Sequence, residues 1–130
     1  MQDFVSDQPN MQGSAKKRAG YIDGRHFLDY IPEVEELKRQ RRYEDAAALL
    51  IRMVDAVEAE AAKEKCGVGP WYYWHLAIVY RKLHRADLEL AILERFASQK
   101  HPRYGATIAK LLERLKDVRK WTDQTASSSS

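Results

Sequence analysis

One stretch of this chain combines aromatic, aliphatic and basic side chains at helical spacing. Its members are Trp71, Trp74, Ile78, Arg81 and Lys82. Residues three or four positions apart lie on one face of a helix, so these side chains are expected to share a face. Trp and Arg are among the residue types that most often anchor protein interfaces. We therefore predict a binding groove for a peptide or a partner protein, in which the indoles hold apolar side chains and Arg81 with Lys82 holds an acidic group.

Charged residues of an earlier predicted helix are expected to border the same groove. They are Glu35, Lys38 and Arg39. With Glu113 and Lys116 of the last predicted helix, they give the groove charges of both signs, whereas a phosphate backbone favours uniform positive charge. A competing interpretation is that the helix over 70–83 is the central one and is packed all round, which would place Trp71 and Trp74 in the core. The sequence leaves both interpretations open.

The sequence does not group residues into a catalytic or metal site. The four histidines are His26, His75, His84 and His101. None has a histidine four positions away, or a nearby Cys or carboxylate at ligand spacing, so we predict no metal and no cofactor. Cys66 is the one cysteine, which excludes an internal disulfide and favours a reducing, cytoplasmic setting. Because no His and acid lie near it in sequence, Cys66 is expected to be a bystander and the protein not to be an enzyme.

The charge balance ranks nucleic-acid binding second. The chain of 130 residues has a net charge of only +3, from 22 basic and 19 acidic residues. Dedicated nucleic-acid binders usually carry a much stronger basic field. Basic runs at 16–18 and 38–42 and the cations of the last predicted helix could form a basic side, but acids such as Glu44 and Asp45 offset them. No segment resembles a secretory signal or reaches the ~20 apolar residues of a membrane span.

The pattern of breaks predicts five helices and an all-α fold. The expected helices span residues 32–41, 43–65, 70–83, 86–99 and 104–120. Pro32 and Pro70 suit the first turn of a helix, where a backbone N–H has no helical partner. No stretch alternates apolar and polar residues over strand length, and short connections make neighbouring helices antiparallel. We expect a packed domain at 27–121, a mostly disordered arm at 1–26 and a disordered Ser-rich tail at 122–130.

Two of the predicted helices repeat one apolar pattern. The first carries Tyr73, Leu76, Ala77 and Tyr80, and the second carries Ile108, Leu111, Leu112 and Leu115. The two patterns lie 35 residues apart, about the period at which helix hairpins stack in repeat arrays. The first resembles helix A of the tetratricopeptide repeat, and Ala91, Phe96 and Pro102 stand close to that family's later small, aromatic and proline positions. His84 stands where the family usually has Gly.

This resemblance implies a short right-handed array of antiparallel hairpins that binds partners on its concave side. With fewer than three full repeats, the ends of such an array can be covered by a partner subunit or by a second copy, giving a homodimer. Residues 69–82 and 91–97 are also similar to a helical module that accompanies the HIRAN domain of some bacterial proteins. The HIRAN domain is linked to DNA ends and repair, and its β-rich part is absent here. The alternative function is therefore an accessory role in DNA processing.

Overall fold

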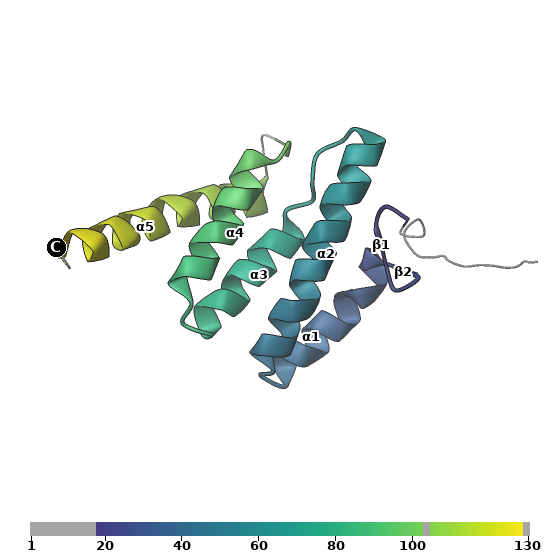
Figure 1. The fold of residues 1–130 in the computed structure, drawn as a ribbon, viewed down its shortest axis with the longest axis horizontal. Coiled ribbons are helices and arrows are strands. Elements are labelled where there is room, and N and C mark those ends of the chain that lie inside the picture. Colours follow the sequence, from purple (N-terminus) through teal and green to yellow (C-terminus); the bar gives the residue numbers. More distant parts are fainter. Residues whose placement is uncertain (1–17, 103–104, 129–130) are drawn as a thin grey trace, which may run out of the picture.

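Local signals in the sequence set where most of the helices begin. The computed structural model describes residues 18–102 and 105–128. Its helices are α1 (Ile31–Arg39), α2 (Tyr43–Glu64), α3 (Trp71–Lys82), α4 (Ala86–Ser98) and α5 (Ala106–Ser128). Pro32 lies in the first turn of α1, and α3 begins directly after Pro70, as predicted. The described part of the chain is therefore all-α apart from one short hairpin (Figure 1).

The turns that join α1 to α2 and α3 to α4 have the same backbone geometry. Arg41 and His84 both adopt the left-handed conformation, with φ of 59° and 58°. After His84, the backbone N–H of Arg85 donates to the carbonyl of Tyr80, with an N to O distance of 3.0 Å, and the corresponding bond follows Arg41. This arrangement satisfies carbonyls that the end of a helix leaves without a partner. It reverses the chain tightly and makes each pair of helices antiparallel.

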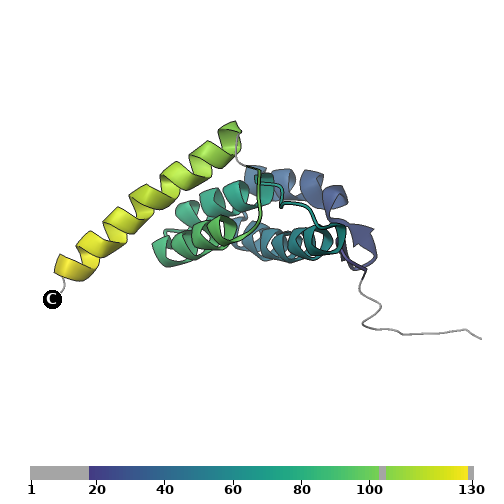
Figure 2. The same cartoon turned by 90° about the horizontal axis from the view of Figure 1, so that it is seen from above.

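The described helices form two layers with one core between them. Helices α1 and α3 lie in one layer, and α2 and α4 lie in the other (Figure 2). Helix α3 packs against both α2 and α4. The largest fully buried side chains include Leu50, Met53, Tyr73, Leu76 and Phe96. The predicted apolar stripe of α3 is thus in the core, where Ala77 is buried as well, and Tyr80 is half-buried.

Helix α5 packs mainly on α4 and runs obliquely to the other helices (Figures 1 and 2). Its buried stripe is Ile108, Leu111, Leu115 and Val118. The helix begins at Ala106, two residues later than expected, after Gly105 with φ of 146°. It continues to Ser128, past the expected end at residue 120, because no Gly or Pro interrupts this segment. The expected Ser-rich tail is therefore helical backbone up to Ser128, and residues 129–130 lie outside the described part.

A short hairpin precedes α1, where we expected a disordered arm. Strands β1 (Tyr21–Ile22) and β2 (Arg25–His26) pair antiparallel and lead into the 3-10 helix η1 (Phe27–Tyr30). The turn residues Asp23 and Gly24 both have positive φ, 49° and 85°. Asp-Gly favours such two-residue turns because their backbone twist matches that of the paired strands. This dipeptide is the local signal that predicts the hairpin.

Contacts with α2 hold the hairpin in place. Ile22 is buried, and its carbonyl accepts a hydrogen bond from the Tyr30 hydroxyl at 2.7 Å. His26 Nε2 lies 2.9 Å from a carboxylate oxygen of Glu60 on α2. The packed domain therefore begins before residue 27, since burial of Ile22 requires the hairpin. The remainder of the predicted arm, residues 1–17, lies outside the described residues.

Candidate functional site

Helix α3 carries two different stripes, and the second is the candidate site. The first stripe, which includes Tyr73 and Leu76, is buried among the other helices. The second consists of Trp71, Trp74, His75, Ile78, Arg81 and Lys82, and we name it the α3 face. Its first four members are half-buried, whereas Arg81 and Lys82 are exposed. The two indoles pack against the edge of the core on one side and are only half-buried. Their surroundings therefore combine the two interpretations left open by the sequence, a binding groove and a helix core.

At one end, the α3 face meets α1 through a lysine and a histidine. Lys38 Nζ lies 2.7 Å from His75 Nδ1, and the His75 ring lies over that of Trp71 with centroids 4.2 Å apart. Burial, followed by the charge of Lys38, lowers the pKa of His75, while Glu35 opposes this. A neutral imidazole with its proton on Nε2 can accept a hydrogen bond from the ammonium at Nδ1. This end of the face therefore holds a lysine against a neutral ring.

At the other end, the α3 face meets α5 around a single indole. The guanidinium carbon of Arg81 lies 5.8 Å from the Trp74 ring centroid, and Lys110 Nζ of α5 lies 6.0 Å from it. Both distances are within the range of attraction between a cation and an aromatic face. Trp74 is thus flanked by positive charge from two helices.

A buried carboxylate joins α3, α4 and α5 beside this indole. The exposed fraction of Glu89 is 2%, and its Oε2 accepts from Arg81 Nη2 at 3.2 Å. Arg114 of α5 binds the same carboxylate with two donors, Nε at 2.6 Å and Nη2 at 3.1 Å. A charge removed from water must be paired, so Glu89 depends on both arginines. The Arg114 guanidinium also lies over the Trp121 ring, 4.6 Å from its centroid.

The sequence reasoning missed Glu89 and Arg114, although one signal for Glu89 was present. Ala91, aligned above with the family's small residue, is exposed. The buried stripe of α4 is Glu89, Ile92, Leu93 and Phe96. Their spacing is that of one helix face, and Glu89 is the only charged member. A charge within an apolar stripe predicts a buried ion pair, but it does not say which helix supplies the cation.

The structure brings some of the predicted groove residues together and separates others. Lys38 contacts the α3 face, and the charge of Glu35 acts on His75 from the same side of α1. Arg39 instead forms an ion pair with Glu36 and is highly exposed. Since consecutive helix positions point about 100° apart, Arg39 turns away from the neighbour that Lys38 contacts. On α3 itself, Arg81 is engaged by Glu89, so its charge is partly neutralised within the chain.

A second charge network joins α3 to α2 and α4. Arg95 of α4 donates to Glu58 of α2, with Nε to Oε2 at 2.8 Å, and its Nη2 donates to Asp55 at 2.7 Å. The Tyr73 hydroxyl donates to Glu58 at 2.8 Å. Burial, and then this hydrogen bond to a carboxylate, raise the pKa of Tyr73. The network ties α2, α3 and α4 together, and its role is structural.

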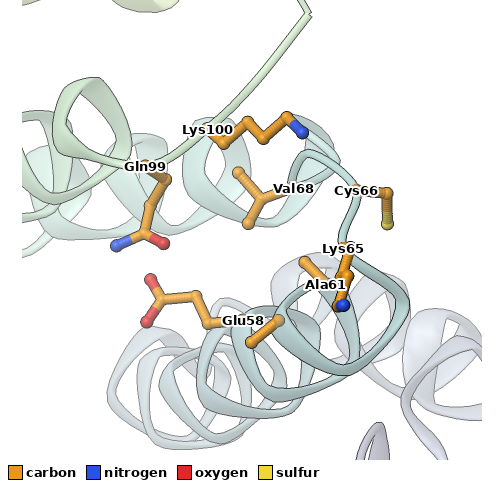
Figure 3. A pocket seen from close by; sticks show the side chains of 8 residues that line it. Glu58, Ala61, Lys65, Cys66, Val68, Gln99 and Lys100 are labelled. Carbon is orange, nitrogen blue, oxygen red and sulfur yellow. The ribbon is translucent and has the colours of Figure 1, made fainter.

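A small open pocket of 240 Å³ lies between the end of α2 and the chain that follows α4 (Figure 3). Its lining residues are Glu58, Ala61, Ala62, Lys65, Cys66, Val68, Gln99 and Lys100. In Figure 3 the carboxylate of Glu58 and the amide of Gln99 face each other across it, and Cys66 lies at the rim. The Glu58 carboxylate already belongs to the Arg95 network. We therefore place the candidate site at the α3 face.

The part of the chain that the structure describes has neither a metal-binding cluster nor a helix that could span a membrane. No group of three or more His, Cys, Asp and Glu side chains is arranged to hold a metal ion within residues 18–102 and 105–128. Over the same residues, no helix has both the length and the apolar composition needed to cross a membrane.

Comparison with known proteins adds no identification. No protein-family model matches the chain, and neither a curated protein nor a solved structure matches it.

Proposed function

We propose that this protein is a non-enzymatic adaptor of the tetratricopeptide-like type that binds a peptide or a segment of a partner protein across the α3 face. It acts in a reducing, cytoplasmic setting, which suits its single exposed cysteine, Cys66. The stacking of hairpin α1–α2 on hairpin α3–α4, with α5 as a terminal helix, supports the repeat-like arrangement. The proposal needs no cofactor or metal.

The observation that carries this proposal is the incomplete burial of two tryptophans on one helix face. Trp71 and Trp74 are held against the core on one side and are accessible on the other. Indoles fixed in this way offer a large apolar area and lose little conformational freedom on binding. Lys38 on α1 and Lys110 on α5 border them and can select the charge of a ligand. These are the features of a protein-interaction surface.

Nucleic-acid binding is the second candidate, and one observation favours it. Cations on both sides of Trp74 could also bind the phosphates of a nucleic acid whose base stacks on the indole. The acids Glu35, Glu89 and Glu113 lie on α1, α4 and α5, however, and an extended phosphate backbone favours a continuous positive track. A peptide, which can carry charges of both signs and apolar groups, fits this mixture better.

Selection from a randomised peptide library on the immobilised protein tests the proposal. We expect it to yield peptides whose binding is lost in Trp74→Ala but kept in Leu28→Ala. Leu28 is the matched control because it is also a large exposed apolar residue, 52% exposed, and lies on η1. Trp74→Ala should destabilise the fold by less than the ~3–5 kcal/mol typical of a fully buried tryptophan. Failure to select any peptide, or equal binding by both variants, would contradict the proposal.

A second copy of the chain is a possible occupant of the same face. In that case, sedimentation of the wild type should reveal a homodimer, and Trp74→Ala should dissociate it while Leu28→Ala does not. A monomer that binds selected peptides would favour the adaptor over the homodimer.

A further inference from the structure

The end of the α3 face that meets α5 carries more positive than negative charge. Its cations are Arg81 on α3 and Lys110 and Arg114 on α5. Its acids are Glu89, which is buried, and Glu113, which is exposed and lies one turn from Lys110. We name these five residues, together with Trp74, the Trp74 cluster. It holds three positive and two negative charges, so it is suited to bind an anionic group.

The ion pairs of the cluster leave this excess charge in place. Glu89 shares one negative charge between Arg81 and Arg114. The other acids near this end of α4 do not add to it, because Asp87 pairs with Arg85 and Glu94 pairs with Arg119. Repulsion among the cations around the partly buried indole raises the free energy of the unbound protein. An additional anion would reduce this repulsion.

Apolar side chains lie next to the excess positive charge, so the anion that binds there is expected to carry an apolar group. Trp74 and Ile78 lie one helical turn apart on the α3 face, and both are half-buried. A ligand that covers them needs an apolar side chain next to its negative group. The other end of the face differs, because Lys38 there contacts a neutral imidazole and Glu35 lies on the same helix. An anion therefore fits the α5 end and not the α1 end.

From this arrangement we infer that the occupant of the α3 face is an acidic protein segment that carries an Asp or Glu beside a large apolar side chain. The apolar side chain covers Trp74 and Ile78, and the carboxylate meets Lys110 of α5. Arg81 contributes less than the sequence suggests, since Glu89 already binds it. This inference rests on the proposed function. It adds the sign of the partner's charge and the residues that recognise that charge.

Peptide selection with a charge-reversed variant tests the inference. Wild-type protein is expected to enrich peptides with Asp or Glu next to Leu, Phe or Trp. Lys110→Glu should weaken the binding of an enriched peptide by about tenfold or more, because attraction becomes repulsion, and added salt should weaken wild-type binding in the same direction. Lys116→Glu is the matched control on α5. The sequence predicted Lys116 beside the groove, but it lies instead on the side of Arg119, which pairs with Glu94 of α4. It should leave binding unchanged.

The outcomes that overturn the inference are distinct from failure of the proposed function. Enriched peptides that are neutral or basic, or equal effects of Lys110→Glu and Lys116→Glu, would overturn the inference while the adaptor function stands. A selection that enriches nothing would overturn both. A single-stranded oligonucleotide that displaces the enriched peptide and depends on Lys110 in the same assay would assign the charge excess to nucleic acid and overturn the inference as well.

Discussion

Two charge networks flank α3, and they have opposite compositions. On the α2 side, one cation meets two acids, because Arg95 binds both Glu58 and Asp55. On the α5 side, one acid meets two cations, because Glu89 binds both Arg81 and Arg114. Each network ties α4 to neighbouring helices. They differ in the sign of the charge that remains.

The two networks also differ in their contact with water. Asp55 is mostly exposed, so its charge is screened and needs no other partner. Glu89 is buried, and its interaction with the arginines takes place where water screens little. The α2 side is thus a structural support. The α5 side combines a structural anchor with an excess of positive charge.

The largest predicted effect is the loss of the buried acid. Glu89→Gln removes the charge that holds Arg81 and Arg114, leaves both guanidiniums close together, and should lower the free energy of unfolding by about 3–5 kcal/mol. Denaturant unfolding measures it. Glu94→Gln is the control, because Glu94 forms an exposed pair with Arg119 that is worth at most about 1 kcal/mol. Equal losses for the two variants would refute the role of Glu89 as a buried anchor.

A smaller loss is expected when the cation of the other network is removed. Arg95→Gln leaves Glu58 and Asp55 without their arginine, while the Tyr73 hydroxyl still donates to Glu58. Because water reaches this network, the free energy of unfolding should fall by about 2 kcal/mol, less than for Glu89→Gln. Peptide binding should be unchanged, since Arg95 binds Glu58 and Asp55 of α2 and not the α3 face. A variant that loses peptide binding while it stays folded would contradict the separation of the two sides.

A modest gain of stability is expected at the turn that connects α3 to α4. His84 is left-handed, with φ of 58°, which costs a residue with a Cβ about 1 kcal/mol relative to glycine. His84→Gly should therefore raise the free energy of unfolding by about that amount without altering either network. His84→Ala is the control and should not stabilise the protein, because alanine keeps the Cβ. Gains in both variants would show that the strain lies elsewhere.

The smallest predicted effect is a change in pH dependence at the α1 end of the α3 face. The pKa of His75 is lowered from its usual 6.5 by burial and by Lys38. The unfolded chain therefore binds this proton more readily than the folded one, so the stabilising contribution is present above about pH 6.5 and is lost as the pH falls below it. Unfolding measured between about pH 7 and 5 should show a weaker pH dependence in His75→Gln. Equal slopes would mean that His75 titrates alike in both states.

Much of the local structure could be predicted from the sequence because its signals are local. Prolines at helix starts, the breaks at residues 66–69 and the apolar stripes all act within a few residues. Two errors have the same origin. The Asp-Gly turn at residues 23–24 favours the hairpin found where a disordered arm is expected, and the absence of Gly or Pro after residue 120 lets the last helix continue.

The candidate site could be predicted only in part. The spacing of Trp71 and Trp74 identified the face, but no local pattern says how deeply a side chain is buried. Arg81 was predicted to be available to a ligand, although Glu89 binds it eight positions later. Lys110 was not among the predicted site residues, since its approach to Trp74 depends on where α5 crosses.

The amino-acid sequence by itself determined the helices and the two stripes of α3, because helix formation and periodicity depend on neighbours in the chain. Only the tertiary structure decided which charges meet. Arg114 and Glu89 are 25 positions apart, and Lys38 and His75 are 37 positions apart. Such pairs form when packed helices bring distant turns within a few ångströms, and charge interactions depend on that distance and on burial. The positive charge beside Trp74 is therefore a property of the folded protein.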